Sequence, residues 1–281
     1  MAIIKKIAIV AKSDSQAAIG IAQNILEKFS DVVEIILSPS TARSLSLSSL
    51  RVPIVPIKSM RYEGAEVLIC IGGDGTVLRS ISKMEDPLPI LGINVGTLGF
   101  LVDVSPHEAL NTIERILSGF TYNERLRLDV KFNGEKLPSA TNEAVLITGR
   151  PAKILTFKIQ VDQCEMEELR ADGVVFATPT GSTAYAMSAG GPIVDPRVDA
   201  AVIVPLAPFK LSARPWVVPA DSILKIRVTI PEKKAAIVID GQYTYHVSEK
   251  DEVFLTEAKN PARFVDSSLI SFYEKVQNKL M

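Results

Sequence analysis

The chain of 281 residues contains 47% apolar residues, so it is long enough for one large domain or two moderate ones and can bury hydrophobic cores. Its 31 basic and 32 acidic residues are scattered along the sequence and leave a net charge of -1, which argues against nucleic acid or a membrane surface and favours a small-molecule partner. No apolar run approaches the roughly 18 residues of a membrane span, and residues 1–10 are too strand-like for a signal peptide, so we expect a cytoplasmic protein.

Short apolar runs alternate with helical patterns in the first part of the chain. Nearly continuous apolar runs, typical of parallel strands buried on both faces, predict strands at residues 7–10, 32–37, 67–71 and 90–93. A helix is expected after the candidate N-caps Ser13 and Asp14, and a second over residues 106–117. The serine-rich residues 38–49 are expected to form a surface loop. We therefore predict an α/β layered domain with a mostly parallel sheet over residues 1–121.

A glycine-rich loop follows the third of these strands. Gly72, Gly73 and Gly75 lack a Cβ, so the backbone can adopt positive φ and bring consecutive N–H groups close to an anion. Asp74 would repel a phosphate, and its position is better explained by a metal ion or by a hydroxyl that must lose a proton. A tight turn in which Asp74 caps the next helix is the alternative. Since ligands bind beyond the carboxyl ends of strands in such sheets, the pattern favours phosphoryl transfer.

The hydrophobic period changes to two after about residue 122. Residues 126–132 alternate before the hairpin signal Asn133-Gly134, and residues 155–161 and 224–230 alternate again. We predict a β-sandwich-like domain over residues 122–267. Helical spacing then predicts a terminal helix over residues 268–281 that packs back on the first domain; its apolar positions are Leu269, Phe272, Val276 and Leu280.

Residues 169–196 form a second candidate site, because few structural loops need so many hydroxyl groups and glycines. Hydroxyls and backbone N–H groups can line a ribose or base pocket, and Tyr185 adds a flat apolar face with a polar tip. The alternative is an irregular connection whose Ser and Thr side chains satisfy its own backbone. Next to a sugar, the amide and carboxylate of Asn142 and Glu143 suit paired ribose hydroxyls.

The cysteines and histidines carry no metal-binding or catalytic pattern. Cys70 and Cys164 lack metal-type spacing, so we expect no disulfide, and we expect Cys70 to be a small buried residue of a strand. His107 and His246 have no partner at metal spacing, and no protein metal ligand is assigned.

Five motifs occur in order along the chain: residues 72–76 (Gly-Gly-Asp-Gly-Thr), 96–100 (Gly-Thr-Leu-Gly-Phe), 142–143 (Asn-Glu), the glycine-rich stretch of residues 172–192, and 240–242 (Asp-Gly-Gln). In kind and order they resemble the motifs of the NAD kinases, which phosphorylate the 2′-hydroxyl of the adenosine ribose of NAD to give NADP. A lone Gly-Gly-Asp-Gly is shared with diacylglycerol, sphingosine and phosphofructo-kinases, whereas five motifs in order are specific. The resemblance spans most of the chain and implies the two-domain organisation predicted above.

The resemblance implies roles for residues at the matching positions. Asp74 is implied as the base or orienting carboxylate, and the residues implied to hold donor phosphates are Gly72, Gly73, Gly75 and Thr76. The implied NAD-binding residues are Phe100, Asn142, Glu143, Arg170, Asp172, Thr183, Ala184, Tyr185, Ser188, Asp240 and Gln242. Of these, ribose hydroxyls are assigned to Asn142 and Glu143, the adenine end to Thr183, Ala184 and Ser188, and the nicotinamide end to Asp172, Tyr185 and Phe100.

The resemblance also implies partners and leaves alternatives. ATP, or alternatively inorganic polyphosphate, is the implied donor, with Mg²⁺ or another divalent cation on its phosphates. A NAD pocket built partly at a subunit contact, as in the family, implies a homodimer or homotetramer. A lipid or sugar kinase with the same glycine loop is one alternative, disfavoured for lipid by the hydroxyl-rich loop. A dinucleotide sensor without turnover is the other, disfavoured by the intact Asp74.

Overall fold

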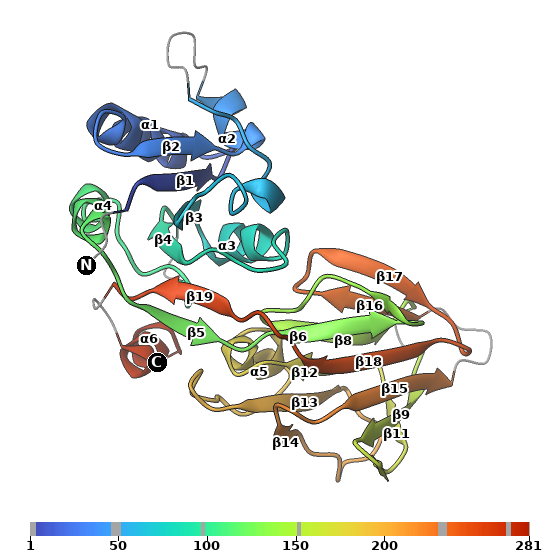
Figure 1. Cartoon of the computed structure of the whole chain (residues 1–281). Coiled ribbons are helices and arrows are strands. Elements are labelled where there is room, and N and C mark those ends of the chain that lie inside the picture. The colour runs from blue at the N-terminus through green and yellow to red at the C-terminus, as the bar shows by residue number, and fades with distance from the viewer. Residues whose placement is uncertain are drawn as a thin grey trace. The chain divides into compact units, whose positions relative to one another are not determined.

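The computed structural model describes residues 4–45, 52–96, 99–150, 153–229, 235–267 and 271–280 (Figure 1). The chain divides into two compact units. The first, here called the α/β unit, comprises Met1–Glu124 and Ala262–Met281, and the second, called the β unit, comprises Arg125–Pro261. No helix within the described residues has both the length and the apolar character needed to cross a membrane.

The α/β unit is built on a six-stranded sheet in the order β2-β1-β3-β4-β19-β5. The strands are β1 (Lys6–Ala11), β2 (Glu34–Leu37), β3 (Val67–Gly72), β4 (Ile90–Asn94), β19 (Ala262–Val265) and β5 (Tyr122–Arg125). β1 pairs in parallel with β2 and β3, and β4 pairs in parallel with β3 and β19. All six residues of β3 are buried, which explains the continuous apolar run that predicted it.

Helices cover both faces of this sheet. α1 (Gln16–Phe29) and α4 (Ala109–Leu117) pack with Ile7 and Ile9 on one face, while α3 (Asp74–Ile81) packs with Ala8 and Val10 on the other. Figure 1 shows α4 and α3 on opposite sides of β3 and β4. The alternating residues of β1 thus divide between two cores, as the pleat of a strand requires.

Two local details differ from the sequence predictions at the first helix. The N-cap of α1 is Ser15, whose Oγ accepts the Ala18 N–H at 3.3 Å, and not Ser13 or Asp14. β2 begins only at Glu34, because Val32 is 69% exposed and its N–H donates to the Phe29 carbonyl in the turn after α1. Hydrophobicity predicted Val32 as part of the strand, but the turn geometry places it in solvent.

The serine-rich segment is partly helical. α2 (Pro39–Ser44) begins behind Ser38, whose Oγ accepts the Thr41 N–H at 3.3 Å, and a short 3-10 helix follows at Ile57–Ser59. Thr41 is buried and its Oγ1 accepts the Ala11 N–H at 2.8 Å, so this helix is tied to the end of β1. The predicted surface loop is therefore wrong for residues 39–44, because a serine followed by proline is a strong helix start. Residues 46–49 lie outside the described residues.

The β unit is an antiparallel sandwich, as the period-two pattern predicted. One sheet has the order β10-β9-β15-β18-β6-β7 with β11 on β9, and the other has the order β14-β13-β12-β8-β16-β17. The strands are β6 (Leu128–Phe132), β7 (Glu135–Lys136), β8 (Glu143–Thr148), β9 (Leu155–Val161), β10 (Cys164–Glu165), β11 (Leu169–Ala171), β12 (Gly173–Ala177), β13 (Ala200–Leu206), β14 (Trp216–Pro219), β15 (Leu224–Thr229), β16 (Ala235–Ile239), β17 (Tyr243–Val247) and β18 (Glu252–Glu257). Phe157 of the first sheet and Phe176 of the second are fully buried in the shared core.

The unit boundaries differ from the predicted residues 122 and 267. The sequence pattern assigns β5 and β19 to the all-β domain, but both strands lie in the sheet of the α/β unit. Phe264 of β19 pairs with Ile90, and Arg263 donates to Asp86 Oδ1 at 2.7 Å. A hydrophobic period identifies a strand without identifying the sheet that it joins, which explains the difference.

The terminal helix, α6 (Phe272–Leu280), belongs to the α/β unit. Leu269, predicted in this helix, lies outside the described residues. Cys70 is fully buried in β3 and Cys164 is exposed, and neither forms a disulfide, as expected.

Candidate functional site

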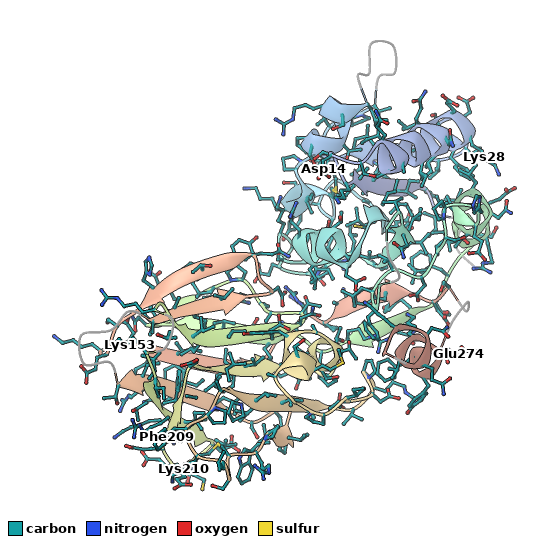
Figure 2. All side chains as sticks on the ribbon, turned by 180° about the vertical axis from the view of Figure 1, so that it is seen from behind. Asp14, Lys28, Lys153, Phe209, Lys210 and Glu274 are labelled. Carbon is teal, nitrogen blue, oxygen red and sulfur yellow. The ribbon has the colours of Figure 1, made fainter. Side chains whose placement is uncertain are left out.

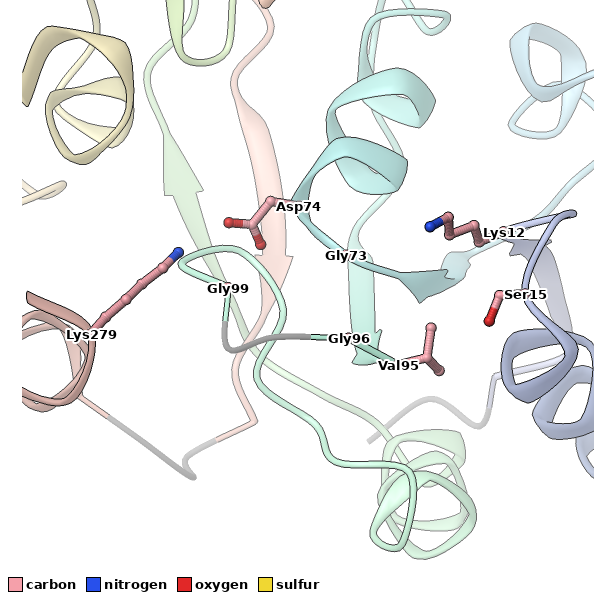
Figure 3. Close-up of a pocket in the computed structure, with 8 residues that line it drawn as sticks. All are labelled: Lys12, Ser15, Gly73, Asp74, Val95, Gly96, Gly99 and Lys279. Carbon is pink, nitrogen blue, oxygen red and sulfur yellow. The ribbon is translucent and has the colours of Figure 1, made fainter. Parts of the chain in front are cut away.

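A pocket opens in the α/β unit at the carboxyl ends of β1 and β3. Its volume is about 280 Å³, and its lining residues are Lys12, Ser15, Gly73, Asp74, Val95, Gly96, Gly99 and Lys279 (Figure 3). The connection after β1 runs through α1 on one face of the sheet, and the connection after β3 runs through α3 on the other. A crevice forms where neighbouring connections leave in opposite directions, and this is the usual ligand site of an open α/β sheet.

Asp74, the first residue of α3, is held firmly in this pocket. Its Oδ2 accepts the Phe100 N–H at 2.8 Å and its Oδ1 accepts the Leu101 N–H at 3.0 Å. Gly99 permits this approach, since a Cβ there would overlap Asp74 Oδ1 and lie 2.7 Å from Val102 Cγ2. The carboxylate predicted as a base or orienting group is therefore itself oriented by two backbone amides.

The glycines around Asp74 do not use the positive φ that glycine permits. Gly73 is extended, at φ -111° and ψ -174°, and neither Gly72 nor Gly75 is among the glycines with positive φ. Only glycine fits at position 72, because a Cβ there would lie 2.7 Å from Thr76 Cβ. The Thr76 side chain thus packs against the end of β3, and Thr76 does not line the pocket. At Gly73 and Gly75, by contrast, a Cβ would meet no protein atom within 4 Å.

Two lysines complete the pocket, and sequence reasoning missed both. Lys12 follows β1 directly, and Lys279 lies on α6, with its Nζ 4.3 Å from the centre of the Phe100 ring. Figure 3 shows their ammonium groups on either side of Asp74. The position of Lys12 beyond the carboxyl end of a predicted strand was a usable signal. For Lys279 no local signal exists, because it is more than 200 residues along the chain from Asp74.

In the β unit, three of the motifs meet at one end of a sheet. Asn142 and Glu143 stand at the start of β8, whose antiparallel neighbours β12 and β16 end there, with Ala177 opposite Glu143 and Ile239 opposite Ala144. Asp240, which follows β16, accepts the N–H groups of Thr141, Asn142 and Glu143 at 2.8 to 3.0 Å. Asp240 thus fixes the backbone of the Asn-Glu pair, a positioning role that its spacing in the sequence did not indicate.

Three hydroxyl groups of the segment after β12 donate to backbone carbonyls, two of them within the same loop. Thr178 Oγ1 donates to the Thr141 carbonyl at 2.6 Å, and Ser182 Oγ donates to the Pro179 carbonyl at 2.6 Å. Thr183 Oγ1 donates to the Thr180 carbonyl at 3.2 Å. These hydroxyls build the short helices Thr180–Thr183 and α5 (Tyr185–Ser188) next to Asn142, where Tyr185 is 42% exposed.

The predicted NAD-binding residues divide into separate groups. Arg170 and Asp172 lie just before β12, whereas Thr183, Ala184, Tyr185 and Ser188 follow its other end; β12 has five residues, a length of roughly 16 Å at strand spacing. Arg170 lies over the ring of the exposed Phe209, 4.6 Å from its centre; Figure 2 labels Phe209. Gln242 donates its backbone N–H to the Ile239 carbonyl in the β16–β17 turn at 2.9 Å. Phe100 belongs to the α/β unit.

Glu143 has an unusual electrostatic environment. Burial, and next the negative charge of Asp240, raise the pKa of Glu143 from its ordinary value of 4.5 to about 8, although a hydrogen bond from the Tyr185 N–H lowers it. Burial also raises the pKa of Asp240, while the three amide hydrogen bonds and the positive charge of Arg127 oppose that effect. Its Oε2 is buried and has no partner among the described residues.

The buried Glu143 predicts a pH dependence of stability. Since its pKa is raised on folding, its contribution is fully present below about pH 4.5 and is lost as the pH rises through about 8. Over this window the wild type should lose on the order of 3–5 kcal/mol relative to Glu143→Gln, which mimics the protonated acid. Chemical denaturation of both proteins at pH 5 and pH 8 measures the difference. Glu135→Gln, at an exposed position, is the matched control. An equal change in unfolding free energy between pH 5 and pH 8 for Glu143→Gln and wild type would contradict the raised pKa of Glu143.

The chain is similar to known proteins along nearly its whole length. Residues 7–120 match the family model of the ATP-NAD kinase N-terminal domain, and residues 141–267 match that of the ATP-NAD kinase C-terminal domain. The NAD kinase of Methanosarcina barkeri is 56% identical over 277 residues, which cover 99% of each chain. The NAD kinase of Methanothermobacter thermautotrophicus is 50% identical over 225 residues, 80% of this chain and 79% of the relative.

Solved structures share the fold. The crystal structure of yeast NADH kinase complexed with NADH matches with a TM-score of 0.86 at 24% identity, covering 99% of this chain and 87% of the other, and this likeness concerns the fold. The structure of an NAD kinase from Archaeoglobus fulgidus in complex with ATP matches with a TM-score of 0.75 at 27% identity, covering 98% and 97% of the two chains.

Proposed function

The chain belongs to the NAD kinase family, and on that premise we propose that its α/β unit holds ATP at the Asp74 pocket while its β unit binds NAD at the Asn142 end of β8. The reaction transfers the terminal phosphoryl group of ATP to the 2′-hydroxyl of the adenosine ribose of NAD. The observation that carries the assignment of the pocket is a carboxylate fixed by two backbone amides, with a lysine on either side of it.

The pocket in the α/β unit suits a polyphosphate donor. Lys12 and Lys279 bring positive charge, and the first turn of α3 presents N–H groups from the positive end of the helix dipole. At Gly73 and Gly75 a Cβ would clash with no protein atom, so packing within the protein does not explain why these residues are glycines. A ligand that approaches the backbone closely supplies that reason. Inorganic polyphosphate presents the same terminal group as ATP, so it is a second candidate donor.

Asp74 acts mainly by orienting the acceptor hydroxyl. A sugar hydroxyl is a far weaker acid than a carboxylic acid, so little alkoxide forms before attack and the proton moves late. In a loose phosphoryl transition state the nucleophile needs position more than full ionisation. The two amides that fix the Asp74 oxygens provide this position, because they leave the carboxylate one rigid orientation.

The pocket fits a divalent cation that arrives on the donor. No group of three or more His, Cys, Asp or Glu side chains able to hold a metal occurs among the described residues, and the pocket lining contains the single carboxylate Asp74. Mg²⁺ is commonly bound through substrate phosphates and one or two carboxylates, which matches this donor set. When bound, the ion offsets phosphate charge. Lys12 and Lys279 would contact phosphate oxygens that the ion leaves open.

The NAD site is supported by an unsatisfied acid. Glu143 Oε2 is buried without a partner in the described structure, and a ribose hydroxyl would satisfy it. The neighbouring Asn142 side chain is half-buried, and the exposed face of Tyr185 offers a surface for a flat ring. Ala184 and Ser188 lie on the same loop and short helix, so we assign them to the base at this end.

Arg170 and Asp172 are assigned to a second copy of the chain. Within one β unit they lie at the opposite end of β12 from Thr183. The length of the strand therefore prevents one end of a bound dinucleotide from contacting both Asp172 and Thr183. A homodimer or homotetramer in which a neighbour supplies these residues resolves the separation. Light scattering with size-exclusion chromatography measures the assembly, and a monomer with full activity would contradict it.

The function is tested by incubating the full chain with NAD, ATP and Mg²⁺ and detecting NADP with an NADP-specific dehydrogenase. Formation of NADP is expected. A folded protein that binds NAD but makes no NADP would support the sensor instead. Parallel reactions with polyphosphate identify the donor.

Gly73→Ala separates ligand approach from protein packing. The new Cβ meets no protein atom within 4 Å and Gly73 is extended, so the unfolding free energy should change by less than about 1 kcal/mol. The KM for ATP should rise about tenfold or more, because the Cβ stands where the donor approaches the backbone. Steady-state kinetics and denaturation measure both effects. Gly20→Ala is the matched control, because a Cβ there also meets no atom within 4 Å. An unchanged KM for ATP in Gly73→Ala would show that ATP does not bind next to Gly73.

A further inference from the structure

A buried lysine lies on the terminal helix. Lys275 of α6 is 8% exposed, and its Nζ lies 2.5 Å from Asp103 Oδ1 and donates to the Phe100 carbonyl at 3.3 Å. Lysine is rarely buried unless it is paired, because removing an ammonium group from water is costly. A buried ion pair seldom adds net stability over apolar residues of the same size, so stability alone does not explain the Lys275–Asp103 pair.

The contacts of Lys275 lead directly to Asp74. Lys275 holds the Phe100 carbonyl oxygen, and the same peptide group carries the Leu101 N–H that donates to Asp74 Oδ1 at 3.0 Å. Since a peptide group is planar, fixing its C=O also fixes the direction of its N–H. A cation on the carbonyl further polarises the peptide and strengthens its N–H as a donor. Lys275 is thus one peptide group away from the carboxylate.

A second residue of α6 contacts the same loop. Lys279 follows Lys275 by four residues, so both side chains lie on one face of the helix. Its Nζ lies 4.3 Å from the centre of the Phe100 ring, and Figure 3 shows it directed toward the loop that contains Gly99. The helix therefore holds Phe100 by its carbonyl and by its ring, while the Phe100 N–H donates to Asp74 Oδ2 at 2.8 Å.

We propose that Lys275 is a positioning residue for the phosphoryl transfer. Paired with Asp103, it holds the Phe100 carbonyl and so fixes the Leu101 amide directly and the Phe100 amide through the adjoining residue. Both amides orient Asp74, which makes α6 part of the machinery that aligns the acceptor hydroxyl. This inference rests on the proposed function for its kinetic consequences. Its structural core, the hold of Lys275 on the Phe100–Leu101 peptide, is independent of the reaction.

The first test is Lys275→Met, which keeps an unbranched apolar side chain of nearly the same length and removes the charge. We expect kcat to fall about tenfold, since misplacement of a reacting group by a fraction of an ångström is costly, while the Kd for NAD stays unchanged. Lys28→Met is the matched control, because Lys28 (labelled in Figure 2) is an exposed lysine of the α/β unit. It also has an acidic partner, Glu114. A kcat of Lys275→Met within about twofold of wild type would overturn the proposal.

The second test asks whether the effect passes through Asp74. In the Asp74→Asn background, Lys275→Met should lower kcat by less than about twofold further, because the group that it positions has already been changed. Asp103→Asn should lower kcat in the same direction, and the Lys275→Met, Asp103→Asn double variant should be no worse than Lys275→Met. Should Lys275→Met fail to fold, the loss of kcat caused by Asp103→Asn is compared in the wild-type and Asp74→Asn backgrounds instead. Fully additive losses would assign the pair a general stabilising role and overturn the proposal.

Hydrogen exchange separates this inference from the proposed function. The Phe100 and Leu101 amides should exchange at least about tenfold faster in Lys275→Met than in wild type or Lys28→Met, without a global loss of protection. If the wild type makes no NADP, the proposed function fails while this measurement still tests the hold on the loop. Unchanged exchange at both amides would overturn the positioning role whatever the activity.

Discussion

Asp74→Asn is expected to lower kcat about 10²-fold or more, the usual effect of losing a positioned proton acceptor. An asparagine keeps one oxygen but turns an NH₂ group toward one of the two N–H donors of Phe100 and Leu101, so one of these hydrogen bonds is lost. The side chain also loses its capacity to accept the proton of the hydroxyl. NAD binding should be retained, because the residues assigned to NAD in the β unit are untouched. Steady-state kinetics and calorimetric titration with NAD measure the two effects.

The control for Asp74→Asn is Asp31→Asn, an exposed acid in the turn after α1. Its kcat and stability should match the wild type. Wild-type turnover in Asp74→Asn would remove Asp74 from the mechanism. A raised Kd for NAD at an unchanged kcat would instead show that Asp74 acts through binding in the ground state.

Gly181→Ala is expected to have the largest effect in the β unit. A Cβ on Gly181 would overlap the Asn142 carbonyl oxygen and lie 2.7 Å from Asn142 Cα, and backbone atoms cannot rotate away as a flexible side chain can. Overpacking of this kind costs about 1–3 kcal/mol and occasionally more. The Asn142–Glu143 segment must move to relieve the overlap, so the Kd for NAD should rise at least about tenfold.

Chemical denaturation and calorimetric titration check this prediction. Gly20→Ala adds the same methyl group where no atom lies within 4 Å. It should leave the Kd for NAD unchanged and raise the unfolding free energy by up to about 1 kcal/mol, because Gly20 lies inside helix α1. Turnover at saturating NAD should fall less than the affinity, because Asp74 and the donor pocket belong to the other unit. A Gly181→Ala protein with normal NAD affinity would show that the Asn142 segment does not bind the dinucleotide.

Several features could be predicted from the sequence because they are local. The buried strands β1, β3 and β4 appear as apolar runs, and the antiparallel strands of the β unit appear as a period of two. Asp74 was identifiable because its neighbours in the chain are glycines at the end of a strand, which is a pattern of consecutive residues. The five ordered motifs identified the family for the same reason, since each is a short stretch of adjacent residues.

Other features depend on contacts between distant parts of the chain. The partners of Asp74 lie 26 and 27 residues away, and Lys275 reaches a carbonyl 175 residues away. Glycines next to Asp74 could adopt positive φ, but in the fold Gly73 has an extended backbone and Thr76 packs against Gly72. Likewise, only the fold showed that Ser182 and Thr183 bond to their own loop.

The amino-acid order by itself thus determined the family, the class of each unit and the acid at the centre of the pocket, because periodicity and adjacency are properties of the chain. Tertiary structure decided which sheet β5 and β19 join, which lysines flank Asp74 and how far Glu143 is removed from water. The physical reason is that pairing, electrostatic interaction and desolvation act through space, between groups that only folding brings together.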